Sequence, residues 1–349
     1  MNTIEVAGRH VGTGHACFII AEAGVNHNGE IELAKRLVDA AREANADAVK
    51  FQTWVTEKLI ATDAAMAEYQ KQNLGREQRQ FEMLKRLEFT HDQFRELKAY
   101  AEHSSILFLS TPDEEESADF LERMGMPVFK IGSGEVTNLP YLHHVALKMK
   151  PIILSTGMST LGEVEAAVRT MEEAGNQRLA LLHCVSDYPA QACDCNLRAM
   201  DTLASAFGYP VGFSDHTLGI DIAVAAVARG ACVLEKHLTL DQTMPGPDHS
   251  ASLDPAEFAS MVRAIREIES ALGDGVKKPA PSEFETKKVV QKAIVAARPV
   301  RIGEVLAERD LALKRTSGGL VPAYLPLIIG RCADRDIEVN CTITMDMLR

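Results

Sequence analysis

The stretch FIIAEAGVNHNGEIELAKRLVDAAREANADAVKF, residues 18–51, contains the pattern that decides the fold. It begins with a short apolar run and continues through a loop that contains Gly24 and Gly29. A segment follows, Ile31–Ala44, in which apolar residues recur every three or four positions, and then a second short apolar run. These features predict a strand, a loop, an amphipathic helix and the next strand, which is one βα unit and the start of another.

The same order of strand, loop and helix repeats as far as Leu272. The predicted strands are Phe18–Ala21, Ala48–Phe51, Ile106–Leu109, Val128–Ile131, Ile152–Leu154, Leu179–Leu182, Val211–Phe213 and Cys232–Leu234. The last predicted helix is Pro255–Leu272. Eight βα units in about 255 residues match the size of a closed parallel barrel, so we expect an α/β protein with a (β/α)8 TIM barrel. The longer polar insertion Lys58–Glu88 predicts an extra helical segment over the open end of the barrel.

The pattern changes after Leu272. Gly273 ends the last helix, and the following lysines and prolines are typical of a linker. From about Lys288, short strands at Ala293–Ala297 and Leu311–Lys314 alternate with glycine-containing turns. We therefore expect a barrel domain over residues 1–272, a linker over 273–287 and a small, mostly β domain over 288–349.

Composition excludes several classes of partner. The net charge of -12, from 37 Lys and Arg against 49 Asp and Glu, argues against a surface for nucleic acid or an anionic membrane. The first apolar run, Ala16–Ala21, is too short to span a membrane and follows no basic leader, which favours a cytoplasmic protein. Seven cysteines without regular spacing predict reduced thiols.

Polar residues follow every predicted strand. Because the carboxyl ends of barrel strands converge at one end, which we call the mouth, these side chains should form one site. In chain order they are Glu22, Lys50, Gln52, Ser110, Thr111, Lys130, Ser133, Glu135, Ser155, Thr156, His183, Ser186, Ser214, His216, Glu235 and His237.

Two histidines, His216 and His237, end the last two predicted strands. Neutral imidazoles on adjacent strands suit one divalent metal that keeps open positions for a substrate. The alternative is that His216 caps its own loop and His237 is a buried histidine with an internal partner. The residues alone leave both interpretations open.

Two lysines, Lys50 and Lys130, end otherwise apolar strands, where an ammonium group needs an anionic partner. With neighbouring hydroxyls they could bind a phosphate and a carboxylate. They could instead form ion pairs with Glu22, Glu135 or Glu235. A third interpretation is that one lysine forms a Schiff base, as in covalent aldolases.

Longer strings of sequence resemble the sialic acid synthase family and occur in that family's order. They include IAEAGVNHNG at 20–29, VKFQT at 49–53, KIGSGE at 130–135, GFSDHT at 212–217 and PGPDH at 245–249. The string ARPVRIGE at 297–304 resembles the antifreeze-like (SAF) domain that those synthases carry. The resemblance extends from about Phe18 to the end of the chain.

The resemblance implies a synthase that condenses phosphoenolpyruvate with open-chain N-acetylmannosamine and water, giving N-acetylneuraminate and phosphate. It implies that His216 and His237 bind a divalent metal, usually Mn²⁺ with Mg²⁺ and Co²⁺ as alternatives, and that Glu22 and Glu235 take part in catalysis. It also implies a homodimer that exchanges its SAF domains. The implied phosphoenolpyruvate ligands are Lys50, Thr111, Lys130, Ser133, Ser155, Ser186 and Ser214, and the implied sugar ligands are Gln52, Tyr188, Asp248 and the partner chain's Arg315.

Other functions remain open at this point. The same chemistry on a 2,4-diacetamido-2,4,6-trideoxyhexose would give legionaminic or pseudaminic acid, and a 6-phosphorylated sugar would require extra cations near the mouth. A Schiff-base pyruvate aldolase and a non-enzymatic glycan-binding protein are the alternatives of other classes. Ser186 stands where relatives often have Asn, and Thr316 follows Arg315 where relatives usually have another Arg. Met158 is expected to fill the core.

Overall fold

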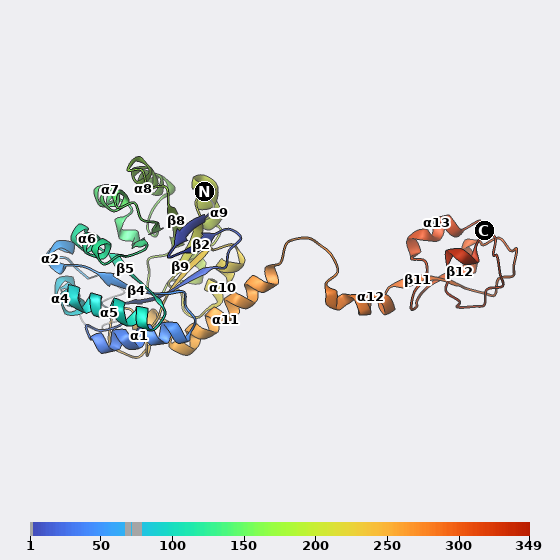
Figure 1. The fold of residues 1–349 in the computed structure, drawn as a ribbon, viewed down its shortest axis with the longest axis horizontal. Coiled ribbons are helices and arrows are strands. Elements are labelled where there is room, and N and C mark those ends of the chain that lie inside the picture. Colours follow the sequence, from blue (N-terminus) through green and yellow to red (C-terminus); the bar gives the residue numbers. More distant parts are fainter. Residues whose placement is uncertain (1–2, 67–70, 72–78) are drawn as a thin grey trace. The chain divides into compact units, whose positions relative to one another are not determined.

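The computed structural model describes residues 3–66, 71 and 79–349. It divides into two compact units, Met1–Gly273 and Asp274–Arg349, which are described separately below. Figure 1 shows the first unit as strands surrounded by helices.

The first unit is a parallel barrel. In the described part of the chain an eight-stranded sheet has the order β5-β4-β3-β10-β9-β8-β7-β6, and its two end strands, β5 and β6, also contact each other. The strands are β3 (Phe18–Gly24), β4 (Ala48–Thr53), β5 (Leu107–Pro112), β6 (Phe129–Ile131), β7 (Ile152–Ser155), β8 (Leu179–Cys184), β9 (Val211–Asp215) and β10 (Val233–His237). The predicted TIM barrel is confirmed.

Helices cover the outside of the barrel (Figure 1). They are α1 (Ile31–Glu43), α5 (His91–His103), α6 (Glu115–Arg123), α7 (Leu139–Leu147), α8 (Leu161–Glu173), α9 (Ala199–Phe207), α10 (Asp221–Ala228) and α11 (Pro255–Leu272). Thr90, Thr160 and Asp254 each begin a helix with a capping box, in which the side chain accepts a hydrogen bond from a backbone N–H of the first turn.

Most barrel strands extend further toward the mouth than the apolar runs predict. β3 continues to Gly24, β4 to Thr53 and β10 to His237. The ladder continues through polar residues, since His237 pairs with Glu22 across β10 and β3. Polar side chains can occupy these strand ends because they face the mouth, so a search for apolar runs ends each strand too early.

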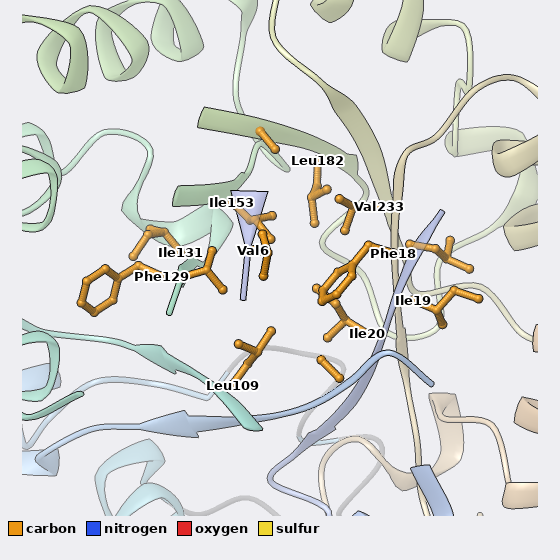
Figure 2. Packing of buried hydrophobic residues seen from close by; sticks show 14 of the residues in the cluster. Val6, Phe18, Ile19, Ile20, Leu109, Phe129, Ile131, Ile153, Leu182 and Val233 are labelled. Atoms are coloured by element: carbon orange, nitrogen blue, oxygen red, sulfur yellow. The ribbon is translucent and has the colours of Figure 1, made fainter. Parts of the chain in front are cut away.

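A hairpin that the sequence reading missed closes the opposite end of the barrel. Its strands are β1 (Thr3–Val6) and β2 (Arg9–Gly12). Val6 and Val11 are fully buried, and Figure 2 shows Val6 among barrel side chains such as Phe18 and Ile153. The hairpin escaped prediction because its apolar residues are single and alternate with polar ones.

The insertion between β4 and α5 begins with the short helix α2 (Thr56–Leu59) and ends with α4 (Gln80–Leu87). The extra helical segment predicted over Lys58–Glu88 falls partly on residues 67–70 and 72–78, which lie outside the described residues. The described parts form a small apolar cluster beside the barrel. Its buried members are Val25, Trp54, Met66, Met83 and Leu87.

The second unit contains α12 (Phe284–Val290), α13 (Leu325–Ile328) and an antiparallel pair, β11 (Lys292–Ala296) and β12 (Leu311–Arg315). Both strands lie within one residue of the predicted ones. The unit has its own apolar core, which is formed by Ile294, Ala296, Val300, Leu306, Ile328, Ala333, Ile337, Ile343 and Leu348.

The cysteines form no disulfide among the described residues, and Cys17, Cys184, Cys195 and Cys232 are buried. Across the described ranges, no helix combines the length and the apolar character that a membrane span requires.

Candidate active site

The mouth of the barrel contains a cavity of about 540 Å³. Its lining comes from the carboxyl ends of all eight strands and from the loops that follow them. The lining residues are Glu22, Lys50, Gln52, Gln80, Thr111, Asp113, Lys130, Gly132, Ser133, Gly134, Ser155, Met158, Cys184, Ser186, Tyr188, Ser214, His216, Glu235 and His237. Most of the predicted site residues therefore meet in one place. The predicted residues that are not part of this lining are Ser110, Glu135, Thr156, His183, Asp248 and Arg315.

Two lysines and two glutamates form a chain of buried ion pairs at the base of the cavity. Lys50 Nζ lies 2.7 Å from Glu22 Oε2 and 3.7 Å from Glu235 Oε2. Lys130 Nζ lies 3.2 Å from Glu235 Oε1. The ion-pair interpretation of the two lysines is therefore correct for Glu22 and Glu235. It is wrong for Glu135, whose carboxylate accepts a hydrogen bond from the adjacent loop instead.

The two glutamates of this chain have pKa values that are shifted in opposite directions. Burial raises the pKa of Glu22, although Lys50 opposes this shift. Burial also acts to raise the pKa of Glu235, but Lys130 and Lys50 together outweigh it and hold this pKa below its usual value. Burial disfavours the charged form of Lys50, yet Glu22 and Glu235 raise its pKa. Lys50 is thus an ammonium ion at neutral pH, which is unfavourable for the Schiff-base role.

Hydroxyl groups surround this charged base. Lys50 Nζ donates to Thr111 Oγ1 at 2.8 Å, and Ser214 Oγ donates to Glu235 Oε1 at 3.1 Å. Ser155 Oγ is buried and has no hydrogen-bond partner among the described residues. An unpaired buried hydroxyl in a cavity that also contains two ammonium groups is suited to an anionic ligand.

The loop after β7 approaches the next loop closely at Gly157. Its backbone N–H donates to Ser133 Oγ at 3.0 Å, and a Cβ atom at this position would lie 2.4 Å from Ser186 Oγ and 2.7 Å from Cys184 Sγ. A side chain at this position would displace the hydroxyl of Ser186 and the thiol of Cys184 from the cavity wall.

We expect Gly157→Ala to raise the KM for the anionic substrate roughly 10- to 100-fold, because a displacement of about 1 Å is enough for such a loss. Steady-state kinetics would measure this change. Gly162→Ala is the matched control, since a Cβ there meets nothing within 4 Å. Equal KM values for the two variants would contradict a role of this close approach in substrate binding.

The two histidines lie side by side, with ring centroids 5.4 Å apart. The Nδ1 atom of His216 lies 2.6 Å from the carbonyl oxygen of Val185, so this nitrogen donates and Nε2 retains its lone pair. Nδ1 of His237 is buried and has no hydrogen-bond partner among the described residues. Burial lowers the pKa of both rings, and for His237 the neighbouring His216 lowers it further. Both imidazoles are therefore neutral at pH 7 and can act as ligands.

This donor set fits a divalent metal. A carboxylate, Asp248, lies nearby with Oδ2 3.8 Å from His237 Nδ1, and burial raises its pKa to about 7 with a further contribution from Glu22. No group of three or more His, Cys, Asp or Glu positioned for a metal occurs among residues 3–66, 71 and 79–349. The protein would therefore supply the two histidines and leave the remaining positions of a metal to substrate and water.

Strand alternation positions these histidines. Along β10, Glu235 and His237 face the mouth, while Lys236 between them points outward and is fully buried. Its Nζ lies 2.8 Å from Asp215 Oδ2 and also donates to the carbonyl of Thr217. Asp215 Oδ1 in turn accepts from the backbone N–H and the hydroxyl of Thr217, at 2.9 and 2.8 Å. The Lys236–Asp215 pair thus fixes the loop on both sides of His216.

A second network joins the loops after the first and last barrel strands. Asn26 Nδ2 donates to the carbonyl of Leu238 at 2.9 Å and to Ser252 Oγ at 2.9 Å. The hydroxyl of Ser252 donates to the carbonyl of Asp248 at 2.7 Å. These bonds hold the backbone of Asp248 beside the mouth.

The structure adds cavity residues that the sequence reading missed or misjudged. Asp113 and Gln80 line the cavity but were not expected in the site. Met158 was expected in the core, which is wrong, because 75% of it is exposed and it lines the rim. The weak signal for Asp113 was its place directly after β5.

Arg315 ends β12 of the second unit, and its side chain is exposed. Its predicted sugar contact stays a prediction. None of the described residues that line the cavity is an arginine.

Comparison with known proteins identifies the family of the chain. The model of the NeuB family matches residues 37–277, and the model of the SAF domain matches residues 291–349. The chain belongs to the NeuB family. NeuB-family members include synthases of sialic, legionaminic and pseudaminic acids, so the protein is an enzyme of transferase type.

Named relatives in the NeuB family cover almost the whole chain. The chain is 46% identical to the N,N'-diacetyllegionaminic acid synthase of Legionella pneumophila, over 95% of this chain and 94% of that protein. It is 45% identical to the enzyme of the same name from Campylobacter jejuni, over 92% and 96%. It is 40% identical to human N-acetylneuraminate-9-phosphate synthase, over 98% and 95%.

Solved structures agree with this NeuB assignment. An N-acetylneuraminic acid synthetase from Leptospira borgpetersenii is 35% identical and matches with a TM-score of 0.71, covering 81% of this chain and 94% of that one. The spore coat polysaccharide biosynthesis protein SpsE from Bacillus subtilis is 34% identical and matches with a TM-score of 0.68, covering 99% of both chains.

Proposed function

We propose that this NeuB-family enzyme condenses phosphoenolpyruvate with 2,4-diacetamido-2,4,6-trideoxymannose and water, giving N,N'-diacetyllegionaminic acid and phosphate. The choice of sugar rests on sequence identities of 46% and 45% to two enzymes that are named for that product. Pseudaminic acid synthases from Campylobacter jejuni are less similar, at 34%.

The cavity supports the first substrate of this proposal. Phosphoenolpyruvate carries a phosphate and a carboxylate, and the cavity presents two ammonium groups, Lys50 and Lys130, among hydroxyls. The unpaired hydroxyl of Ser155 would donate to one of its oxygens. Further hydroxyls that we assign to the same ligand are those of Thr111, Ser133, Ser186 and Ser214.

The bond-forming step requires the enol carbon of phosphoenolpyruvate to attack the aldehyde carbon of the open-chain sugar. Positive charge then develops on the carbon that carries the phosphate. Glu235, which stays ionised because its pKa is low, would stabilise this charge. The former aldehyde oxygen takes up a proton and becomes a hydroxyl, water adds to the positively charged carbon and loses a proton, and the C–O bond to phosphate then breaks as that carbon becomes the keto carbon. Glu22, whose pKa burial raises, is suited to accept a proton from the water.

We further propose that His216 and His237 bind a divalent metal, with Mn²⁺ as the first candidate. The support is the neutral state of both rings and the unpartnered Nδ1 of His237. When bound there, such a metal supplies a Lewis acid that polarises the aldehyde of the sugar. Gln52, Tyr188 and Asp248 would orient the sugar.

Two copies of the chain would complete the site. We propose a homodimer in which the second unit of one copy covers the mouth of the other and presents Arg315 to the sugar. The exposure of Arg315 and the lack of arginine among the described cavity residues support this arrangement. Gel filtration with light scattering tests it, and a monomeric active enzyme would contradict it.

The second candidate sugar is N-acetylmannosamine, which the sequence resemblance alone implied. The match to a sialic acid synthetase structure at 35% identity favours it, but the relatives named for legionaminic acid are more similar. Only the substituents at C4 and C6 of the sugar distinguish the two candidates.

The test compares kcat/KM for the two sugars and for the altrose isomer, with phosphoenolpyruvate and Mn²⁺ and a chelator control for each. Preference for the diacetamido mannose isomer by about tenfold or more, the loss expected when a buried polar partner is missing, would support the proposal. Equal or better use of N-acetylmannosamine would replace the proposed sugar. Full activity in the presence of the chelator would contradict the metal.

A further inference from the structure

Asp113 occupies a fixed position at the rim of the cavity. It directly follows β5, and its backbone N–H donates to the carbonyl of Thr53 at 3.0 Å. The preceding carbonyl, of Pro112, accepts a hydrogen bond from the buried hydroxyl of Tyr141 at 2.5 Å. The backbone is therefore held on both sides, and the half-buried carboxylate lines the cavity.

Within the part of the chain that the structure describes, the carboxylate of Asp113 has no partner of its own. No described residue forms a hydrogen bond or an ion pair with it, and the two nearby ammonium groups, Lys50 and Lys130, are engaged with Glu22 and Glu235. A half-buried carboxylate without a fixed partner is available to a ligand.

The barrel places Asp113 across the mouth from the histidines. In the strand order β5 and β9 lie on opposite sides of the ring, and β9 leads into His216. The strand beside β5 carries Gln52, which we assign to the sugar and which pairs in register with Thr111. With phosphoenolpyruvate on Lys50 and Lys130 at the base of the cavity, a sugar whose aldehyde lies by the histidines would extend above it across the mouth, and its C4 to C6 end would face the side that carries Asp113.

We propose that Asp113 determines sugar specificity by accepting a hydrogen bond from the C4 to C6 end of an uncharged sugar and by repelling a sugar with a phosphate there. This inference rests on the proposed condensation. Asp113 would be the residue that selects against a 6-phosphorylated sugar. The other strand-end residues do not exclude this class of substrate.

Charge supports this selection. A phosphate at the far end of the sugar would lie near a carboxylate in a partly water-excluded cavity, where like charges repel strongly. Among the described lining residues the only cations are Lys50 and Lys130. Phosphoenolpyruvate would already bind both of them, so neither would be left to neutralise a second phosphate. An amide or hydroxyl at the same end of the sugar would instead donate to the free carboxylate.

The selection should depend on pH. Burial raises the pKa of Asp113 to about 7; Lys50 and Lys130 oppose this shift, and Glu135 and Glu22 add to it. The hydroxyl of Tyr141 also faces this region. The carboxyl is neutral well below this pKa and charged above it, so repulsion of a phosphorylated sugar grows as pH rises.

The experiment compares N-acetylmannosamine with its 6-phosphate, which differ only by the phosphate, in the full-length enzyme with phosphoenolpyruvate and Mn²⁺. We expect Asp113→Asn, which keeps the shape and removes the charge, to raise the kcat/KM ratio of phosphorylated to unphosphorylated sugar about 10- to 100-fold. Asp113→Ser provides a second neutral variant. From about pH 6 to about pH 8 the ratio should fall in the wild type and fall less in the variants.

Glu135→Gln is the matched control, because that half-buried carboxylate lies outside the cavity lining and is hydrogen-bonded to Asn138 at 2.6 Å. At about pH 8, where Asp113 is charged with or without Glu135, its ratio should stay close to that of the wild type and well below those of the Asp113 variants. Turnover of N-acetylmannosamine with an unchanged ratio in both Asp113 variants would overturn this inference and leave the proposed condensation intact. Failure of every sugar to release phosphate would overturn the condensation and the inference with it.

Discussion

Replacing His237 with alanine should lower kcat/KM by about 1000-fold or more, because a Lewis acid contributes several kcal/mol of transition-state stabilisation. The same variant should lose affinity for Mn²⁺ in the absence of substrates, which a titration of the apo-protein measures directly. The physical reason is that His237 supplies one of the two imidazoles that the site offers to a metal.

The control for this variant is His143→Ala, since that side chain is exposed on α7 and lies outside the cavity. It should retain wild-type activity and metal affinity. Circular dichroism melting of both variants separates loss of a ligand from loss of the fold. A His237→Ala protein that melts normally and binds Mn²⁺ as tightly as wild type would contradict the assigned ligand.

Replacing Lys236 with methionine should reduce the free energy of unfolding of the barrel by about 3–5 kcal/mol, because it leaves the buried carboxylate of Asp215 without its partner. Both side chains have an exposed fraction of 0%, and their closest atoms lie 2.8 Å apart. Urea denaturation measures the change. The affinity for Mn²⁺ should fall as well, since the loop around His216 loses its anchor at Thr217.

The double variant Asp215→Asn with Lys236→Met should recover part of the lost stability, because no unpaired charge remains in it. Lys35→Met is the control for loss of a lysine in a surface ion pair and should change stability far less. A Lys236→Met protein as stable as wild type would show that the pair is not required to anchor the loop.

The barrel could be predicted because its strands begin with short apolar runs that need burial, as at Ile152–Leu154. The strand ends could not, since Glu22 and His237 are polar and resemble loop residues until they are seen to pair in register across β3 and β10. The hairpin β1–β2 was missed for a related reason. Ile4, Val6 and Val11 are its buried contacts, and in two strands of four residues each this alternation is too short to give a clear signal.

The candidate site could be predicted to the extent that topology determines it. Parallel strands bring their carboxyl ends together whatever the loops do, so His216 and His237 were expected to meet. The sequence could not show whether Lys50 forms an ion pair with a protein carboxylate or binds an anionic ligand, because either partner compensates the charge of a buried ammonium group.

Asp113 was missed because it begins an acidic run that resembles a helix start. The run is Asp113-Glu114-Glu115-Glu116, and Glu114 does cap α6 by accepting hydrogen bonds from two backbone N–H groups. Asp113 stands one residue earlier and lines the cavity instead. The backbone turn between β5 and α6 directs Asp113 into the cavity and Glu114 to the first turn of α6.

The central claim is that the barrel condenses phosphoenolpyruvate with the sugar by breaking the C–O bond to phosphate. The most direct measurement incubates the enzyme with phosphoenolpyruvate, Mn²⁺ and the diacetamido sugar in water labelled with heavy oxygen, followed by mass spectrometry of both products. We expect one unlabelled phosphate for each nonulosonic acid formed. Heavy oxygen in the released phosphate, or phosphate release without a new acid, would contradict it.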